Sequence, residues 1–184
     1  MHNRREDQTS FFTHLRQDRP LPTTRATLRP GFLMIPAAPT AVAAVAAASV
    51  VVTLYDVDQK KGGLCHFVKP RPAPGVPFTA MYGLPAVAYL IKHLQENGNT
   101  NHLRAGIYGG AAPLWASAFQ RKLAENNIAV AHNFFKRKGI LVYEEDTGGH
   151  RGRKIVYHTG SNEVVVMKTE QVRRMDWFAH YAAG

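Results

Sequence analysis

The sequence predicts a single α+β domain in which mixed β-sheets pack against helices. Several β-branched and aromatic segments bounded by glycine, asparagine and aspartate turns predict strands. Two longer segments carry apolar residues at helical spacing, which predicts amphipathic helices. A chain of 184 residues with 45% hydrophobic content can bury one sizeable core. We expect one domain over residues 27–170, with a flexible basic arm before it (1–26) and a tail or short helix after it (171–184).

The predicted strands are short and are separated by turn signals. The alanine- and valine-rich run over residues 37–53 is ambiguous in its first part, because this composition suits a helix and a strand equally. The predicted strands cover residues 27–32 (or a turn), 50–55, 64–68, 103–108, 140–143, 154–157 and 163–168.

Residues 50–68 are predicted to form a β-hairpin. The stretch 58–63 is polar and ends in two glycines, which is typical of a hairpin turn. Two antiparallel strands joined there would bring Ser49 and His66 to the same end of the hairpin, or near it.

Two helices are expected to pack on the sheet. Apolar residues at helical spacing over 80–94 predict the first, which would stop at Asn97-Gly98-Asn99. The second is expected in two parts over 114–138, ended by Gly139 at a C′ position. The proline-rich stretch 70–77 is predicted to be an extended loop.

Charge and cysteine content limit the classes of partner and compartment. The net charge is +10 and the pI is near 10, which favours an acidic partner: nucleic acid, anionic lipid or an acidic protein. The arginine-rich arm is either a simple tail or a binding arm for such a partner. The single cysteine, Cys65, excludes an intramolecular disulfide and a cysteine-cluster zinc site. We predict a cytoplasmic protein without a cofactor or metal.

No membrane insertion is expected. The longest apolar stretch, residues 37–53, is interrupted by Pro39, Thr40 and Ser49 and falls short of the roughly twenty apolar residues that a spanning helix needs. A secretory signal is not expected either. A start at Met34 would lack the basic region that such signals carry.

One spacing and several short motifs point to a family. Ser49 and His66 lie seventeen positions apart, and His66 follows two glycines and precedes Phe-x-x-Pro. Further motifs keep fixed distances over residues 27–170: Gly31 eighteen positions before Ser49, Gly109-Gly110-Ala111, Asn127 nineteen positions before Asp146-x-Gly-Gly, and Gly148-Gly149 followed by Arg153-Lys154. Together they resemble the CheD family of chemoreceptor glutamine deamidases, in which a cysteine stands at the position of Ser49.

The resemblance implies a CheD-like sandwich and a reaction. The substrates would be glutamine side chains of methyl-accepting chemotaxis receptors, converted to glutamate with release of ammonia. Some members are linked with methyl-ester hydrolysis, and a CheC-type phosphatase is the usual partner. Ser49 would be the nucleophile and His66 the base.

The sequence departs from the site of this family in three respects. Ser49 replaces the cysteine, and a hydroxyl is far less ionised than a thiol near neutral pH. Ala47 and Ala48 stand where the family has glycine and serine. The threonine that orients the histidine falls on Ala44 or Ala43, which have no hydrogen-bonding side chain. A catalytically inactive relative that still binds receptors or the phosphatase is therefore the alternative.

Cys65 is not expected to replace the missing thiol. Neighbouring residues on a strand point to opposite faces, so the Cys65 thiol would face away from the His66 imidazole. A small buried hydrophobic residue is the simpler interpretation of Cys65. For His66 alone, a hydrogen-bonded core histidine is the structural alternative.

A basic nucleic-acid-binding module is a rival from another class, but no recognition helix or stacking sheet favours it. The glycine pairs also fit a phosphate cradle, yet no Gly-rich loop is followed by Lys-Ser or Lys-Thr. Arg151, Arg153 and Lys154 are interpreted as a solvated basic turn in preference to an anion site.

Overall fold

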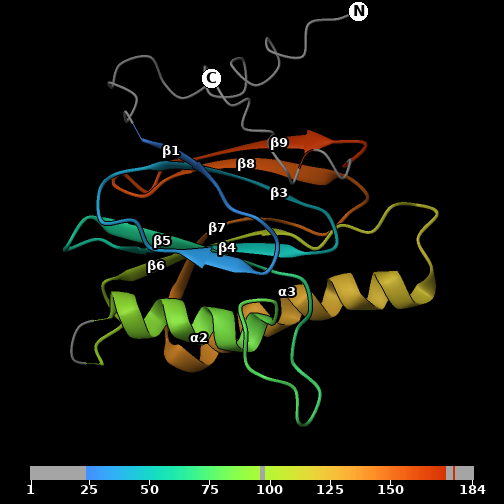
Figure 1. Cartoon of the computed structure of the whole chain (residues 1–184), viewed down its shortest axis with the longest axis horizontal. Coiled ribbons are helices and arrows are strands. Elements are labelled where there is room, and N and C mark those ends of the chain that lie inside the picture. The colour runs from blue at the N-terminus through green and yellow to red at the C-terminus, as the bar shows by residue number, and fades with distance from the viewer. Residues whose placement is uncertain (1–23, 96–97, 173–175, 177–184) are drawn as a thin grey trace, which may run out of the picture.

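The fold has three layers: a four-stranded sheet, a five-stranded sheet and a layer of helices (Figure 1). The computed structural model describes residues 24–95, 98–172 and 176. The predicted α+β class and the single domain with mixed sheets packed against helices are confirmed, and the strands form two sheets. The elements are β1 (Arg25–Thr27), β2 (Phe32–Met34), β3 (Ala41–Ala46), β4 (Val50–Asp56), β5 (Lys61–Phe67), α2 (Gly83–Leu94), β6 (Leu103–Gly109), α3 (Ala118–Lys138), β7 (Leu141–Thr147), β8 (Gly152–His158) and β9 (Val164–Thr169).

Both sheets contain parallel and antiparallel pairs. The four-stranded sheet has the order β1-β3-β8-β9, with β1 parallel to β3 and the other pairs antiparallel. The five-stranded sheet has the order β2-β5-β4-β6-β7, with β7 parallel to β6. The chain changes sheets between β3 and β4, over residues 47–49. Ser49 therefore lies where the two sheets are joined.

The alanine-rich run contains a strand. Every second residue of β3 faces the other sheet, and Val42, Ala44 and Ala46 are at most 1% exposed. These small side chains pack in one cluster with Tyr108 and Tyr157, whose rings fill the space between the sheets. Tertiary packing decides the strand here, because the local propensity of alanine favours a helix.

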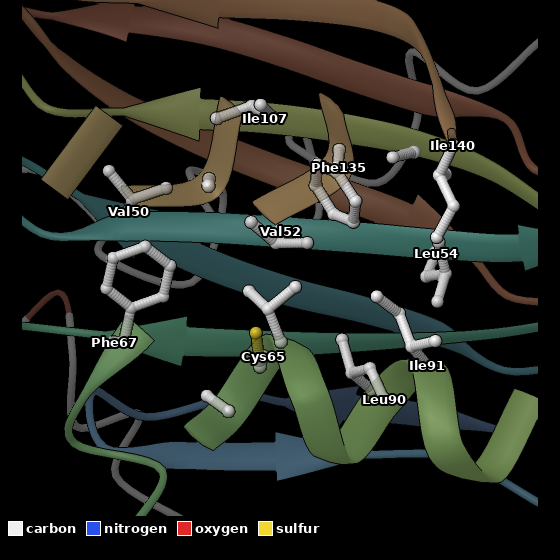
Figure 2. Close-up of a cluster of buried hydrophobic side chains, with 14 of the residues drawn as sticks. Val50, Val52, Leu54, Cys65, Phe67, Leu90, Ile91, Ile107, Phe135 and Ile140 are labelled. Atoms are coloured by element: carbon white, nitrogen blue, oxygen red, sulfur yellow. The ribbon is translucent and has the colours of Figure 1, made fainter. Parts of the chain in front are cut away.

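The larger core lies between the five-stranded sheet and the helices. Figure 2 shows Val50, Val52 and Leu54 of β4 on the same side of the sheet as residues of α2 and α3. Strand alternation places Val51 on the opposite side, in the cluster between the sheets. β4 is fully buried because it is covered on both faces.

The second helix is one continuous α3, so the prediction of two parts from residue 114 was wrong. A capping box formed by Ser117 and Gln120 fixes the start at Ala118. Gly139 ends the helix with a left-handed φ of 65°, as predicted. Neither α2 nor α3 combines the length and apolar character that a membrane crossing needs.

Other boundaries differ by a few residues. Gly62 and Gly63 belong to β5 and not to the turn, because they pair with Tyr55 and Leu54 of β4. The Tyr157 hydroxyl lies where a side chain at position 62 would project, which favours glycine there. Asp146 is part of β7, which extends to Thr147. Arg25 and Ala26, assigned to the arm from the sequence, pair with β3. Residues 1–23 of that arm and most of the predicted C-terminal helix lie outside the described residues.

Candidate active site

The β4–β5 hairpin brings Ser49 and His66 into contact, as the sequence predicts. Val51 pairs with His66 and Val50 with Phe67, so the residue before β4 lies beside the end of β5. The Ser49 Oγ and the His66 Nε2 are 2.8 Å apart, a hydrogen-bond distance. Such a contact is what a serine nucleophile and its base require.

Strand alternation separates His66 from Cys65. The Cys65 side chain lies in the core beneath the helices, as Figure 2 shows, while His66 shares the opposite face of β5 with Leu64 of the cluster between the sheets. Burial also raises the pKa of the Cys65 thiol far above its ordinary value. Cys65 is therefore a buried apolar residue and does not replace the nucleophile, in agreement with the prediction.

Burial sets the charge state of the base. His66 is 0% exposed and Ser49 is 8% exposed. Loss of hydration lowers the pKa of His66 to about 4, and the nearby backbone of Leu28 acts in the opposite direction without cancelling this effect. The imidazole is therefore neutral at pH 7. If Nδ1 carries the ring proton, Nε2 is free to accept the proton of the Ser49 hydroxyl.

The far side of the His66 ring lacks a hydrogen-bonding side chain. Within the described residues, the His66 Nδ1 has no hydrogen-bond partner of normal geometry. Of the two alanines at the family's threonine, only Ala44 lies in the cluster between the sheets. Leu28 comes nearest to replacing that threonine, because its backbone is close enough to influence the pKa of the ring.

The loop that carries Ser49 is held by two neighbouring segments, the stretch after β6 and the helix α3. The N–H groups of Gly110 and Ala111 donate to the carbonyls of Ser49 and Ala47, over 2.9 and 2.7 Å. Asn127 donates from Nδ2 to the carbonyls of Ala48 and Val68, each over 2.9 Å. The sequence motifs at 109–111 and 127 thus converge on this loop.

Asn127 lies in the middle of α3, within the predicted second helix, and is 0% exposed. Its fixed spacing to Asp146 was the available signal, but the spacing did not reveal what its side chain binds.

Arg153 is a buried structural residue, so its interpretation as part of a solvated turn was wrong. It is 3% exposed and donates to the Asp146 carboxylate over 2.7 Å and to the carbonyls of Gly148 and Arg151. The Gly148 N–H in turn donates to the Gly109 carbonyl over 2.9 Å. This network joins the β7–β8 turn to the end of β6, beside the Ser49 loop.

No group of three or more histidine, cysteine, aspartate or glutamate side chains within the described ranges is arranged to hold a metal ion. The chemistry available at the described site is that of a hydroxyl, a neutral imidazole and backbone amides.

The chain is similar to a known family model and to several curated proteins. Residues 70–168 match the family model described as CheD chemotactic sensory transduction. This match begins after Ser49 and His66, so it covers the elements that support the loop but neither of the two side chains.

Several curated proteins resemble most of the chain. "Probable chemoreceptor glutamine deamidase CheD 1" of Anaeromyxobacter dehalogenans is 32% identical over 132 residues, which cover 71% of this chain and 77% of that protein. A protein of Rhodospirillum rubrum with the name "Probable chemoreceptor glutamine deamidase CheD" is 31% identical, over 81% of this chain and 85% of its own length. Another with this name, from Trichlorobacter lovleyi, is 30% identical over 82% of this chain and 94% of its own.

Proposed function

Because the chain belongs to the CheD family, we propose that it is a chemoreceptor glutamine deamidase that acts through Ser49 and His66. The single observation that carries this proposal is the 2.8 Å contact between the Ser49 Oγ and the His66 Nε2. The contact joins two side chains seventeen positions apart in a protein whose relatives are named for deamidation.

The proposed reaction has two half-reactions. In the first, the Ser49 Oγ attacks the side-chain amide carbon of a glutamine while the His66 Nε2 takes the hydroxyl proton. The tetrahedral intermediate collapses as Nε2 returns this proton to the leaving nitrogen, which departs as ammonia and leaves an ester on Ser49. In the second, His66 takes a proton from a water that attacks this ester and returns it to the Ser49 Oγ as the bond between Oγ and the acyl carbon breaks, so that glutamate and free Ser49 result.

The proposed substrates are glutamines of methyl-accepting chemotaxis receptors, and a CheC-type phosphatase is a proposed partner. A net charge of +10 suits a receptor surface rich in glutamate. Since these receptors expose their signalling bundle to the cytoplasm, the protein is proposed to act there.

A catalytically inactive binding protein is the second candidate, and one observation favours it. The His66 Nδ1 has no hydrogen-bond partner of normal geometry among the described residues, so no side chain there fixes the tautomer that catalysis needs, although the Leu28 backbone acts on the ring. A serine nucleophile depends on such a base more than a cysteine does. This protein would bind receptors or the phosphatase without turnover.

Ammonia release from purified receptor cytoplasmic fragments separates the two candidates. We expect release by the unmodified protein and none by His66→Ala, because removal of the imidazole leaves the hydroxyl without a base. Release no greater than that of His66→Ala would contradict the proposed activity and favour the inactive binding protein.

A double variant tests whether Ser49 and Ala44 limit the rate of ammonia release. Ser49→Cys combined with Ala44→Thr restores a thiol and a hydroxyl on the face between the sheets. We expect it to release ammonia at least tenfold faster than the unmodified protein, since a thiol ionises more readily. Equal or slower release by a folded double variant would show that the serine and the alanine do not limit the reaction.

A further inference from the structure

We propose that Asn127 is a positioning residue, which holds the Ala48–Ser49 peptide so that the Ser49 hydroxyl faces His66 and the Ser49 N–H faces the substrate oxygen. This inference rests on the proposed function. It concerns a residue of α3 that is separated from Ser49 and His66 by more than fifty positions of sequence.

The Asn127 amide contacts the backbone next to Ser49 and the backbone near His66. Its Nδ2 donates two hydrogen bonds of 2.9 Å, one to the Ala48 carbonyl and one to the Val68 carbonyl. Ala48 directly precedes the nucleophile, and Val68 follows the base by two positions. One fully buried amide group therefore ties the backbone beside Ser49 to the backbone beside His66.

The contact with Asn127 also sets the direction of the peptide between Ala48 and Ser49. In a trans peptide the C=O and the N–H point in opposite directions, and the described residues contain no cis peptide. Since the Ala48 carbonyl points toward Asn127, the Ser49 N–H points away from α3. No acceptor within the described part of the chain takes a hydrogen bond from this N–H.

A donor in that position suits the charge that develops during the reaction. When the Ser49 Oγ attacks an amide, the carbonyl oxygen becomes negative, and the N–H of the nucleophilic residue itself is a common donor to such an oxyanion. The donor is useful only if its direction is fixed before the reaction. Asn127 fixes it through the carbonyl on the other side of the same peptide.

The adjacent residue provides a matched control. Asn126 also lies in α3 and has the same side chain, but it is exposed. Asn127→Ala removes both donors without adding volume, whereas Asn126→Ala changes an equal number of atoms away from the site.

The first measurement is the kinetics of ammonia release from receptor fragments. We expect Asn127→Ala to lower kcat about tenfold to a hundredfold with KM unchanged, because the lost orientation matters only in the transition state. Asn126→Ala keeps both parameters. A folded Asn127→Ala protein with unchanged kcat, or with a raised KM alone, would overturn the proposal.

A second measurement does not depend on deamidation. In a Ser49→Cys background, the rate of alkylation by iodoacetamide against pH reports how well His66 activates the thiol at position 49. Peptide mapping separates this thiol from Cys65, which is fully buried.

We expect Asn127→Ala to slow alkylation at neutral pH several-fold and to move the profile toward that of an ordinary cysteine. An unchanged profile would overturn the proposed link between Asn127 and the nucleophile. If the unmodified protein releases no ammonia, the proposed function fails, and the alkylation profile still decides the role of Asn127.

Discussion

The histidine determines how the site responds to pH. His66 is fully buried, and loss of hydration lowers its pKa to about 4 from an ordinary value near 6.5. Between these two values the unfolded chain binds a proton that the folded protein does not. The contribution of His66 to stability is therefore complete above about pH 6.5 and falls as the pH falls toward 4.

The lowered pKa of His66 therefore predicts how the stability of the protein depends on pH. Between about pH 7.5 and 4.5, His66 is expected to remove on the order of 2 to 3 kcal/mol from the free energy of unfolding. His66→Gln lacks this group, so its free energy of unfolding should fall less over the same range. Urea unfolding of both proteins at the two pH values checks this, and equal losses would contradict the low pKa of His66.

At the same scale, the sequence predicted the pair Ser49–His66 and the absence of an orienting side chain, but not the role of Asn127. The spacing of seventeen and a hairpin turn were enough to place both residues at one end of two strands. The alanines at positions 43 and 44 predicted that His66 would lack its orienting group, and Nδ1 has no partner of normal geometry among the described residues. The role of Asn127 depends on contacts between segments far apart in the chain and does not follow from spacing alone.

At the scale of elements, the turn after β6 supports the Ser49 loop. Gly109 has a φ of 110°, a conformation that favours glycine, and a Cβ there would collide with the Ser49 carbonyl oxygen. A side chain at this position therefore strains the backbone and pushes against the loop of the nucleophile.

A pair of glycine substitutions tests this support. Gly109→Ala is expected to cost on the order of 2 kcal/mol or more of stability and to lower ammonia release at least tenfold. Gly139→Ala is the control, because Gly139 also has a positive φ but open space around it. That change should cost about 1 kcal/mol and leave activity intact. Similar effects of both changes on activity would argue against the proposed support.

Element boundaries show where sequence patterns were ambiguous. The alanine-rich run fits both helix and strand, and only the alternation of buried residues in β3 decides between them. The start of α3 was placed too early because Leu114 and Trp115 continue the apolar pattern, although both are 82% exposed. Arg153 was misread because its burial depends on how the β7–β8 turn folds, which brings its guanidinium onto the Asp146 carboxylate seven positions earlier.

At the scale of the whole molecule, the five-stranded sheet is the central layer. One face packs on the helices and the other on the four-stranded sheet (Figure 1), and His66 shares the second face with Val51 and Leu64. Loss of the helix layer should destabilise the whole protein and with it the site.

Two phenylalanines of α3 test this arrangement. Phe135 is 0% exposed and lies in the core between the five-stranded sheet and the helices, whereas Phe119 is 76% exposed. Phe135→Ala is expected to lower the free energy of unfolding by about 3 to 5 kcal/mol through the cavity it leaves. Phe119→Ala should cost less than about 1 kcal/mol. Denaturant unfolding measures both, and equal losses would contradict the packing of α3 on the sheet.

The overall fold was the most predictable property. Strands and helices arise from periodic patterns that a single sequence displays, and a chain of this size forms one core system. The distribution of the strands between two sheets was not predictable, since it depends on which distant strands pair.

The most direct test of the proposed activity is mass spectrometry of a receptor cytoplasmic fragment after incubation with the protein. Ser49 and His66 together are predicted to convert specific receptor glutamines to glutamate, so the unmodified protein should produce these sites and Ser49→Ala should produce none. The same conversion by Ser49→Ala, or none by the unmodified protein, would contradict a deamidase that acts through this pair.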